Sequence, residues 1–410
     1  MIKAAFLFAY AFLLLTDSWS QSSISGKVID ASGNRPIAGA SVFISNTSRG
    51  TTSNAAGEFV LPDIPPGTHE LVVSFIGFET YVKSFSSADL PLQLTIKLSM
   101  KVKELEGVTV APFEKDGWIK WGRAFLENFI GTTPNAENCR IVNYKTIKFR
   151  FSKKEDKLSA VAMEPLIIQN RALGYSIHYQ LEGFEVDYKN GSMSYYGYPL
   201  FKEMKADKKK WRIARQKSFL GSVNHFMRSV YDNKLEEQGF EVKRLKKVTN
   251  YEKQRVKTIY KVIEKKQRVA TGEVITVMDY NDEQFPPDSV AYFKTVLRQK
   301  DVFDIYSDYL ISADSVVVFD SVRNKYLYFP DYLAVTYKKA TEDKKYLQSI
   351  MESNRKPFYQ RSTLILTGVG YVSIEKNGSY FSPQDLYTNG YWGWHEKVAE
   401  MLPFDYLLDE

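Results

Sequence analysis

The sequence ISGKVIDASGNRPIAGASVFIS opens residues 24–98 of the chain, and LQLTIKL closes them. Apolar and polar residues alternate in short runs along this stretch, as at Leu71, Val73 and Phe75. Turn-forming residues, such as PPG at residues 65–67, separate the runs. A period of two predicts strands with one buried face. Several short strands at this spacing predict a small antiparallel β-sandwich.

Five short motifs within the stretch are rich in glycine, proline or phenylalanine. They are GKV at residues 26–28, PIAGASV at 36–42, GEF at 57–59, IPPG at 64–67 and FIGF at 75–78. On these motifs the stretch resembles the carboxypeptidase regulatory-like domain, a transthyretin-like β-sandwich, which we place at residues 22–100. In peptidases of the carboxypeptidase D type, this domain lies beside the catalytic unit and holds no zinc ligands. The resemblance therefore implies a fold and not an activity.

A second resemblance follows the sandwich. Residues 105–110 read LEGVTV and are similar to the segment that joins this domain to the plug in TonB-dependent outer-membrane receptors of the Bacteroidota. We expect no plug or large barrel in the residues that follow. The full chain is similar to Bacteroidota envelope proteins of about this length, a family without an established reaction. The resemblance implies a place in the bacterial envelope and leaves the chemistry open.

The first 20 residues have the pattern of a secretory signal peptide. Lys3 precedes an apolar run at residues 4–15, and SWS at residues 18–20 suits a cleavage site. The run is too short for a membrane-spanning helix, although a retained anchor is the alternative. We expect an exported protein of the periplasm or outer membrane, without a transmembrane helix after signal cleavage. Cys139 is the single cysteine, so we expect no internal disulfide and a buried, inert thiol.

The length and composition predict a globular protein with more than one domain. The 410 residues exceed the roughly 250–300 that one hydrophobic core usually serves. The 27 tyrosines and 26 phenylalanines suit a β-rich chain. We expect a linker at residues 101–113 and a larger domain of unknown function at residues 114–410. The predicted fold class is α+β, mainly antiparallel β.

Several local patterns place elements in this larger domain. Helical spacing is expected at residues 114–130, 207–237 with a break at Gly221, 342–351 and 394–402. The apolar residues change parity at Gly183, which predicts a β-bulge. Asn-Gly pairs at residues 190–191 and 377–378 predict tight hairpin turns.

The sequence offers little for catalysis. None of the four histidines, His69, His178, His225 and His395, begins an H-x-x-E or H-E-x-x-H motif, so we expect no metal site. We also expect no cofactor, because no phosphate loop or dinucleotide fingerprint is present. A nucleophile elbow is absent as well. His178 and Glu182 are weak catalytic candidates, since they share the polar face of the strand before the predicted bulge. The alternative is a solvated strand face.

Aromatic residues near the C-terminus suggest a second kind of site. Tyr391, Trp392 and Trp394 could stack on sugar rings if they are exposed. The alternative is that they attach a C-terminal helix to the core. We expect an exported, non-enzymatic binding or assembly protein of the cell envelope. The alternatives are an envelope hydrolase acting on peptide or glycan, and a carbohydrate-binding module.

Positive charge is concentrated in residues 202–268. This segment has 21 Lys and Arg against 8 Asp and Glu, a local charge of +13 in a chain of net charge +7. We expect an anionic-surface patch whose leading residues are Lys208, Lys209, Lys210 and Arg212. Lipid headgroups, anionic glycans or an acidic envelope protein are the expected partners, and nucleic acid is not. The alternative is a solvated face that keeps the protein soluble.

Overall fold

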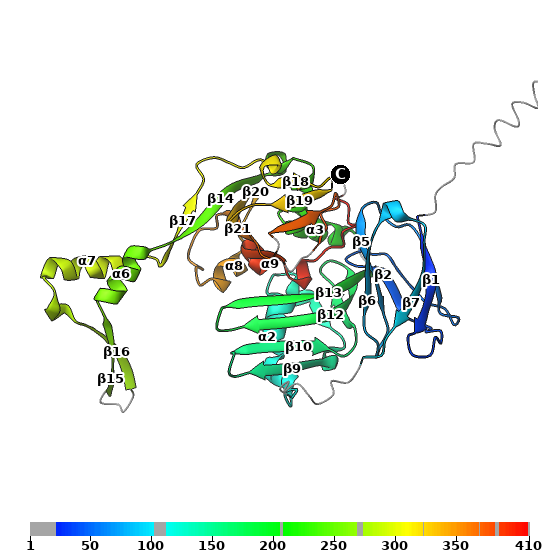
Figure 1. Cartoon of the computed structure of the whole chain (residues 1–410), viewed down its shortest axis with the longest axis horizontal. Coiled ribbons are helices and arrows are strands. Elements are labelled where there is room, and N and C mark those ends of the chain that lie inside the picture. The colour runs from blue at the N-terminus through cyan, green and yellow to red at the C-terminus, as the bar shows by residue number, and fades with distance from the viewer. Residues whose placement is uncertain are drawn as a thin grey trace, which may run out of the picture.

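The structure is a computed structural model (Figure 1). It describes residues 22–101, 112–205, 208–268, 274–322, 324–368, 370–381 and 385–408. The predicted signal peptide, the LEGVTV segment and most of the predicted linker lie outside these ranges. No helix in the described ranges is long and apolar enough to cross a membrane.

The N-terminal region is a sandwich of two sheets, as predicted. Its strands are β1 (Ile24–Asp30), β2 (Ser41–Ile44), β3 (Gly50–Thr52), β4 (Glu58–Leu61), β5 (Thr68–Ser74), β6 (Tyr81–Ser86) and β7 (Leu92–Leu98). One sheet has the order β4-β1-β7 and the other β3-β2-β5-β6. The pairing of β1 with β7 is parallel, against the expectation of an antiparallel sandwich. Gly26 permits this close pairing, because a Cβ there would lie 2.1 Å from the Leu94 carbonyl oxygen.

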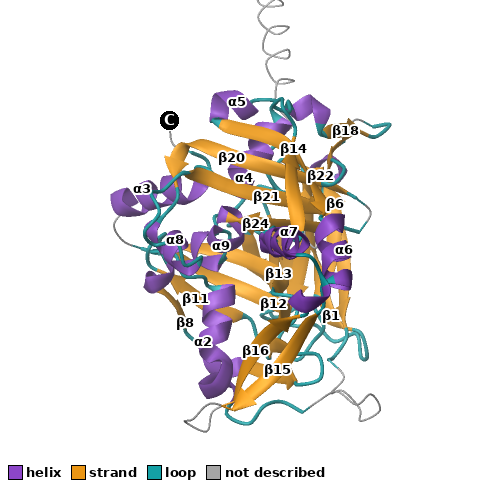
Figure 2. Ribbon diagram, turned by 90° about the vertical axis from the view of Figure 1, so that its left-hand side faces the viewer, coloured by secondary structure: helices purple, strands orange, loops and turns teal. Residues whose placement is uncertain are grey.

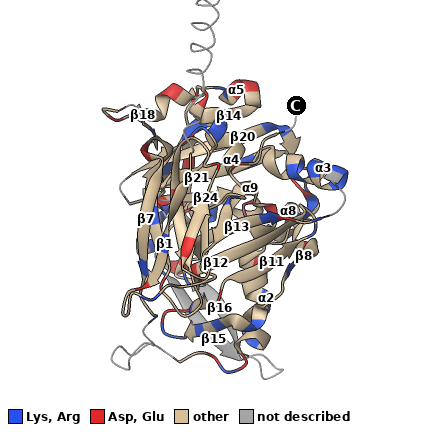
Figure 3. Ribbon diagram, turned by 90° about the vertical axis from the view of Figure 1, so that its right-hand side faces the viewer, with Lys and Arg blue, Asp and Glu red and all other residues tan. Residues whose placement is uncertain are grey.

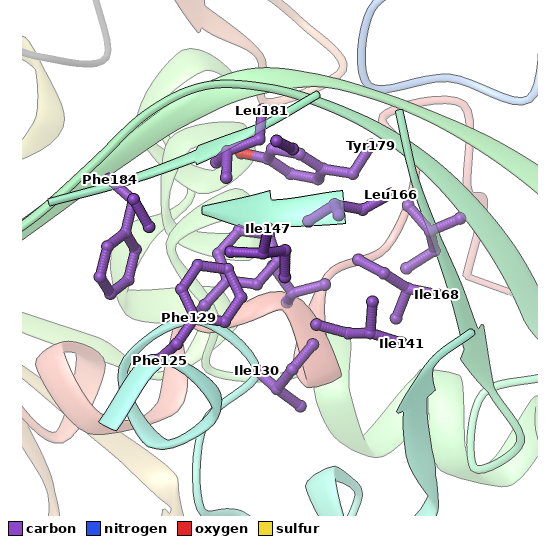
Figure 4. Close-up of a cluster of buried hydrophobic side chains, with 14 of the residues drawn as sticks. Phe125, Phe129, Ile130, Ile141, Ile147, Leu166, Ile168, Tyr179, Leu181 and Phe184 are labelled. Carbon is purple, nitrogen blue, oxygen red and sulfur yellow. The ribbon is translucent and has the colours of Figure 1, made fainter. Parts of the chain in front are cut away.

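The second region is a six-stranded sheet covered by one helix. Its strands are β8 (Cys139–Ile141), β9 (Ile147–Ser152), β10 (Lys157–Ala162), β11 (Leu166–Asn170), β12 (Tyr175–Asp187) and β13 (Ser192–Glu203). The predicted helix at residues 114–130 is present as α2 (Gly117–Phe129). Its Phe125 and Phe129 are fully buried against Tyr179 and Phe184 of β12 (Figure 4). This aromatic layer is the centre of the second core.

The long hairpin of β12 and β13 carries the predicted bulge. The register between the two strands shifts between Leu181 and Gly183. A Cβ at Gly183 would lie 2.2 Å from a ring carbon of Tyr196, so the glycine makes room for a tyrosine on the facing strand. The turn at residues 190–191 joins the strands, with Gly191 at a φ of 63°.

The third region has its own core and two sheets. The larger sheet contains β14 (Phe240–Thr249), β17 (Val302–Tyr306), β20 (Tyr332–Thr341), β21 (Tyr359–Leu366) and β24 (Leu386–Gly390). The smaller contains β18 (Val317–Phe319), β19 (Lys325–Tyr328), β22 (Tyr371–Ile374) and β23 (Tyr380–Phe381). Phe226 and Leu327 are fully buried between them. The predicted hairpin turn at residues 377–378 joins β22 to β23.

The helices of this region differ from the predicted ones at their ends. The helical segment predicted at 207–237 has its predicted break at Gly221 and forms α3 (Lys208–Phe219), α4 (Val223–Tyr231) and α5 (Leu235–Gln238). The break follows the left-handed Gly221, at a φ of 85°. The helix predicted at 342–351 is the shorter α8 (Lys344–Ser349). The helix predicted at 394–402 is wrong, because α9 (Tyr391–His395) ends at the second residue of that range and only a 3₁₀ turn (Val398–Glu400) follows.

An arm projects from the third region (Figure 1). We define the arm as residues 245–306. It begins with the outer half of β14. The pairing of β14 with β20 stops at Leu245, and beyond that residue β14 pairs with β17 alone. Beyond this two-stranded ribbon lie α6 (Tyr251–Ile259), β15 (Val262–Arg268), β16 (Val274–Tyr280) and α7 (Pro287–Arg298). Tyr260, directly after α6, and Phe293 of α7 help to form a small separate core.

Candidate functional site

The face of β12 that carries His178 and Glu182 lies against the sandwich. Thr80 of the sandwich donates a hydrogen bond from Oγ1 to Oε1 of Glu182 at 2.6 Å. His178 is half-buried, and burial, followed by the charge of Lys202, lowers the pKa of its imidazole. No hydrogen bond joins His178 to Glu182 in the described ranges. The structure therefore places these two candidates beside a contact between regions, and the face is not the solvated one expected as the alternative.

The same contact includes backbone hydrogen bonds at β13. The Asn46 N–H donates to the Pro199 carbonyl at 2.8 Å, and the Phe201 N–H donates to the Thr47 carbonyl at 3.0 Å. Leu200, between them, is buried with Phe43 and the adjoining Val72 of the sandwich. The sandwich thus covers the edge of β13 with both hydrogen bonds and apolar side chains. We call this contact the covered edge.

The aromatic candidates near the C-terminus are mostly inside the protein. Trp392 is 2% exposed and donates its indole N–H to the Gly221 carbonyl at 2.7 Å. Tyr391 is also buried, and Trp394 is partly buried and donates to Thr132 Oγ1. The exposed aromatic platform that a sugar site requires is absent at Tyr391 and Trp392. Their role in the structure is to attach the C-terminal segment to the core.

A buried carboxylate that the sequence analysis missed fixes the same segment. Glu400 is 8% exposed and accepts hydrogen bonds from Thr133, Asn135 and Ser218. Burial alone would lower the pKa of the nearby His395, but its hydrogen bond to Glu396 and the charge of Glu400 raise it overall. No local pattern in the sequence indicates this network, because its members are separated by up to 267 positions.

The single cysteine and the metal-ligating residue types have little capacity for chemistry. Burial raises the pKa of the Cys139 thiol to about 12, with a smaller contribution from the charge of Glu400, so the thiol is protonated and unreactive at neutral pH. Among the described residues, no group of three or more His, Cys, Asp or Glu side chains could hold a metal ion.

The structure divides the basic segment into separate surfaces. Lys209, Lys210 and Arg212 are exposed on α3, and Lys208 begins that helix. The other basic cluster lies on β14 and α6, toward the arm, and Figures 1 and 2 both show α3 well apart from α6. A single patch of charge +13 is therefore absent, although the two smaller surfaces remain.

The strand β17 exposes a run of apolar side chains. All five of its residues are exposed, and four are apolar or aromatic. Their exposed fractions are 40% for Val302, 42% for Phe303, 54% for Ile305 and 49% for Tyr306. Exposed apolar residues that are contiguous usually mark an interaction site. This strand was not among the predicted sites, although its apolar residues at 302–306 flank a charged one in the sequence.

One edge of β17 is open. Ser307 N–H donates to the Arg244 carbonyl, and Asn250 N–H donates to the Asp301 carbonyl. These two bonds show which residues of β17 direct their backbone groups toward β14. By the alternation of an antiparallel ladder, the backbone groups of Val302, Asp304 and Tyr306 point away from β14. No described strand pairs with that side. We call it the open edge, and its geometry suits the addition of another strand.

The charges near the open edge are arranged unevenly. Lys243, Arg244 and Lys246 of β14 form no ion pair with a described residue. Asp301 at the end of the ribbon is held by Lys257 at 2.6 Å and by Lys253 at 3.4 Å. The carboxylate of Asp304 is the one charge on β17 itself. The ribbon thus offers apolar contact and backbone hydrogen bonds beside a positive strand.

Comparison with known proteins identifies the N-terminal sandwich. Residues 24–110 match the family model of the CarboxypepD_reg-like domain, and the sandwich belongs to that domain family. No curated protein matches the chain. Two solved matches are chains of cohesin–X-dockerin complexes from Acetivibrio cellulolyticus, with 22% and 16% identity, each covering 19% of this chain, and TM-scores of 0.17 and 0.15. The chain spans about half of those two, 56% and 51%.

A further solved match covers most of the chain. It is a membrane-associated protein of unknown function from Bacteroides fragilis NCTC 9343, with 11% identity over 90% of this chain and 98% of that chain. The TM-score is 0.16. Scores this low carry no argument about fold or function, so the identification rests on the sandwich alone.

Proposed function

We propose that the protein is an exported, non-enzymatic binding or assembly protein of the bacterial cell envelope, and that the open edge of β17 binds its protein partner. The observation that carries the proposal is a strand whose five residues are all exposed, with an open edge, on a projecting arm. The CarboxypepD_reg-like domain and the signal-like pattern of residues 1–20 support the envelope location.

The partner suited to this edge is an extended segment of another protein. Such a segment would hydrogen bond with the backbone of Val302, Asp304 and Tyr306 and cover the apolar side chains on both faces of the ribbon. A second copy of the chain suits the edge less well. Antiparallel pairing of the full strand with itself would place two Asp304 carboxylates opposite each other, and like charges in that position are unfavourable.

The two alternative functions receive less support from the geometry. A hydrolase using His178 and Glu182 would need both side chains at an accessible site, but the sandwich contacts this face through Thr80. A sugar-binding module using Tyr391 and Trp392 would need exposed rings, and both are buried. An extended protein segment at β17 requires no rearrangement of the described residues.

Site-specific photocrosslinking in the cells that produce the protein tests the proposal. A photoreactive residue at position 303 should capture one protein in high yield, identified by mass spectrometry. The same residue at Ile119, an apolar position of α2 that is 84% exposed, is the control for non-specific capture. Equal capture of the same proteins at both positions would contradict the proposal.

Two variants at one position separate strand addition from other contacts. Asp304→Pro removes an outward N–H without breaking a bond to β14, because proline is tolerated on an open edge. Asp304→Ser removes the same charge and keeps the N–H. Capture at position 303 should fall at least about tenfold with proline and persist with serine, since edge addition depends on the backbone. Retention of the partner by the proline variant would overturn the assignment to this edge.

A further inference from the structure

The outward face of α3 combines positive charge with an exposed apolar side chain. Its exposed residues are Lys209, Lys210, Arg212, Ile213, Gln216 and Lys217. Just before the helix, Lys202 and Lys205 are exposed as well. Figure 3 shows this concentration of Lys and Arg along α3. The face lies apart from the arm, so an inference about it is independent of the proposed function (Figures 1 and 2).

The inward face of α3 is firmly attached to the body. Trp211 donates its indole N–H to the Arg171 carbonyl at 3.1 Å. Its ring packs against Gly174 so closely that a Cβ on the glycine would lie 2.0 Å from a ring carbon. Arg215 forms an ion pair with Glu203 at 2.6 Å and lies 3.9 Å above the ring of Tyr175. The helix is therefore attached to the body through the face that carries Trp211 and Arg215.

Three lysines of the outward face have no described acidic partner. Lys209, Lys210 and Lys217 form no ion pair with a described residue. Lys209 and Lys210 also lie in the first turn of α3, where the positive end of the helix dipole disfavours cations. Mutual repulsion and the dipole both raise the free energy of this turn, and an approaching anionic surface would relieve both.

Apolar side chains lie beside this charge. Ile213 is 59% exposed in the middle of the basic face. The C-terminal segment passes alongside, as Figures 1 to 3 agree, and its Leu407 is 76% exposed. Arg228 holds that segment by donating to the carbonyl of Tyr406 at 2.9 Å, and the rings of Tyr406 and Phe219 of α3 lie 5.8 Å apart. Apolar groups within a basic face are typical of a surface that lies on a membrane.

We propose that α3 and the adjacent C-terminal segment form a docking surface for a lipid bilayer with anionic headgroups. Each lysine near such a surface contributes about 1 kcal/mol of attraction, so several together give binding that depends on lipid charge. Ile213 and Leu407 enter the interface between headgroups and acyl chains. A soluble polyanion would use the lysines and leave these two side chains in water, which favours a lipid surface as the ligand.

Co-sedimentation with lipid vesicles tests this surface. The purified chain without residues 1–20 should bind vesicles of phosphatidylcholine with 30% phosphatidylglycerol (a composition of roughly bacterial charge density) and ignore pure phosphatidylcholine. Binding should weaken as salt shortens the Debye length from about 10 Å at 0.1 M to about 3 Å at 1 M. A protein that binds neither vesicle at low salt would overturn the proposal.

Matched variants separate this face from general positive charge. Lys209→Glu, Lys210→Glu and Lys217→Glu together should weaken binding at least about tenfold, since three attractive charges become repulsive. The same charge reversal at Lys243, Arg244 and Lys246 on β14 should have a much smaller effect. Equal losses in the two triple variants would show that net charge alone is responsible and would refute a docking face. Melting temperatures of both triple variants should stay near that of the wild type, because these side chains are exposed, apart from Lys243, which is half-buried.

A third variant distinguishes a bilayer from a soluble polyanion. Ile213→Ser leaves every charge in place, so it should weaken vesicle binding several-fold while binding to heparin, a soluble polyanion, is unchanged. Unchanged vesicle binding by Ile213→Ser, with heparin competing fully for the wild type, would show a site for soluble polyanions and contradict the bilayer assignment.

Discussion

Two strand edges in this molecule differ in what lies against them. They are the covered edge at β13 and the open edge at β17. At β13, Leu200 is buried by the sandwich, and the flanking backbone bonds to Asn46 and Thr47. At β17, Ile305 is 54% exposed, and no described strand pairs beyond it. Both edges offer apolar side chains and backbone groups. The difference is that the chain supplies its own partner for one edge, and the unfilled edge is where a second protein can bind.

The largest difference between the edges should appear when each receives a charge. Leu200→Asp places a carboxylate in an apolar contact without a partner and should lower the free energy of unfolding by about 3 kcal/mol or more. Ile305→Asp at the open edge should change it by less than about 0.5 kcal/mol. Urea denaturation measures both. Similar losses in the two variants would show that the edges do not differ in burial.

Acid should weaken the body before it weakens the arm. Burial first, then the charges of Lys339 and Arg228, lower the pKa of His225 in the body to about 4. The unfolded chain binds this proton near pH 6.5, so stability is full above 6.5 and falls as pH drops toward 4, by about 2–3 kcal/mol. On the arm, the ion pair with Lys257 lowers the pKa of Asp301, so its contribution is lost only as pH falls below about 4.

Denaturation between pH 4 and 7 measures this difference. The imidazole Nδ1 accepts from the Gly221 N–H and Nε2 faces the Gln238 oxygen, an arrangement of the neutral ring. His225→Asn should flatten the pH dependence of unfolding even where it lowers overall stability. A slope that survives the substitution would assign the effect to another group.

The register that carries the covered edge depends on Gly183. Gly183→Val would drive its side chain into Tyr196, because even a Cβ would lie 2.2 Å from that ring. We expect a loss of about 1–3 kcal/mol, the usual cost of overpacking. Since β13 also carries Leu200, the same variant should expose the covered edge to proteolysis. Tyr196→Ala in addition should recover part of the loss, and an unchanged melting temperature in Gly183→Val would show the bulge to be unnecessary.

The smallest effect on stability is expected from the hydrogen bond between Thr80 and Glu182, beside the covered edge. Thr80→Val keeps the shape and removes the hydroxyl that donates to Glu182. Stability should fall by about 1 kcal/mol, because a half-buried carboxylate loses its donor. Thr80→Ser keeps the hydroxyl and is the matched control. If calorimetry finds valine as stable as serine, this bond does not contribute to the contact.

Sequence reasoning succeeded where the relevant interactions are local. The alternation of residues 24–98 predicted the sandwich, and the parity change at Gly183 predicted the bulge. Helix spacing predicted α2, whose aromatic residues bury as expected. The helix predicted at residues 394–402 was wrong because tertiary contacts decide that segment. Val398 packs in the second core and Glu400 accepts hydrogen bonds from residues far away in the sequence.

The surface features depended on what covers each strand, which the sequence does not state. His178 and Glu182 had the pattern of an open polar face, but the sandwich lies against it. The basic segment was contiguous in sequence and is divided in space between α3 and the ribbon of the arm. In each case the missing information is a contact between distant segments.

Residue-resolved hydrogen exchange by mass spectrometry tests the central claim most directly. In the free protein, the Phe201 amide at the covered edge should exchange slowly, and the Asp304 and Tyr306 amides at the open edge should exchange rapidly. When the protein is recovered with the partner captured at position 303, the amides of Asp304 and Tyr306 should slow by at least about tenfold, as new strand bonds protect them. Exchange at Asp304 and Tyr306 that is equally fast with and without the partner would contradict the account.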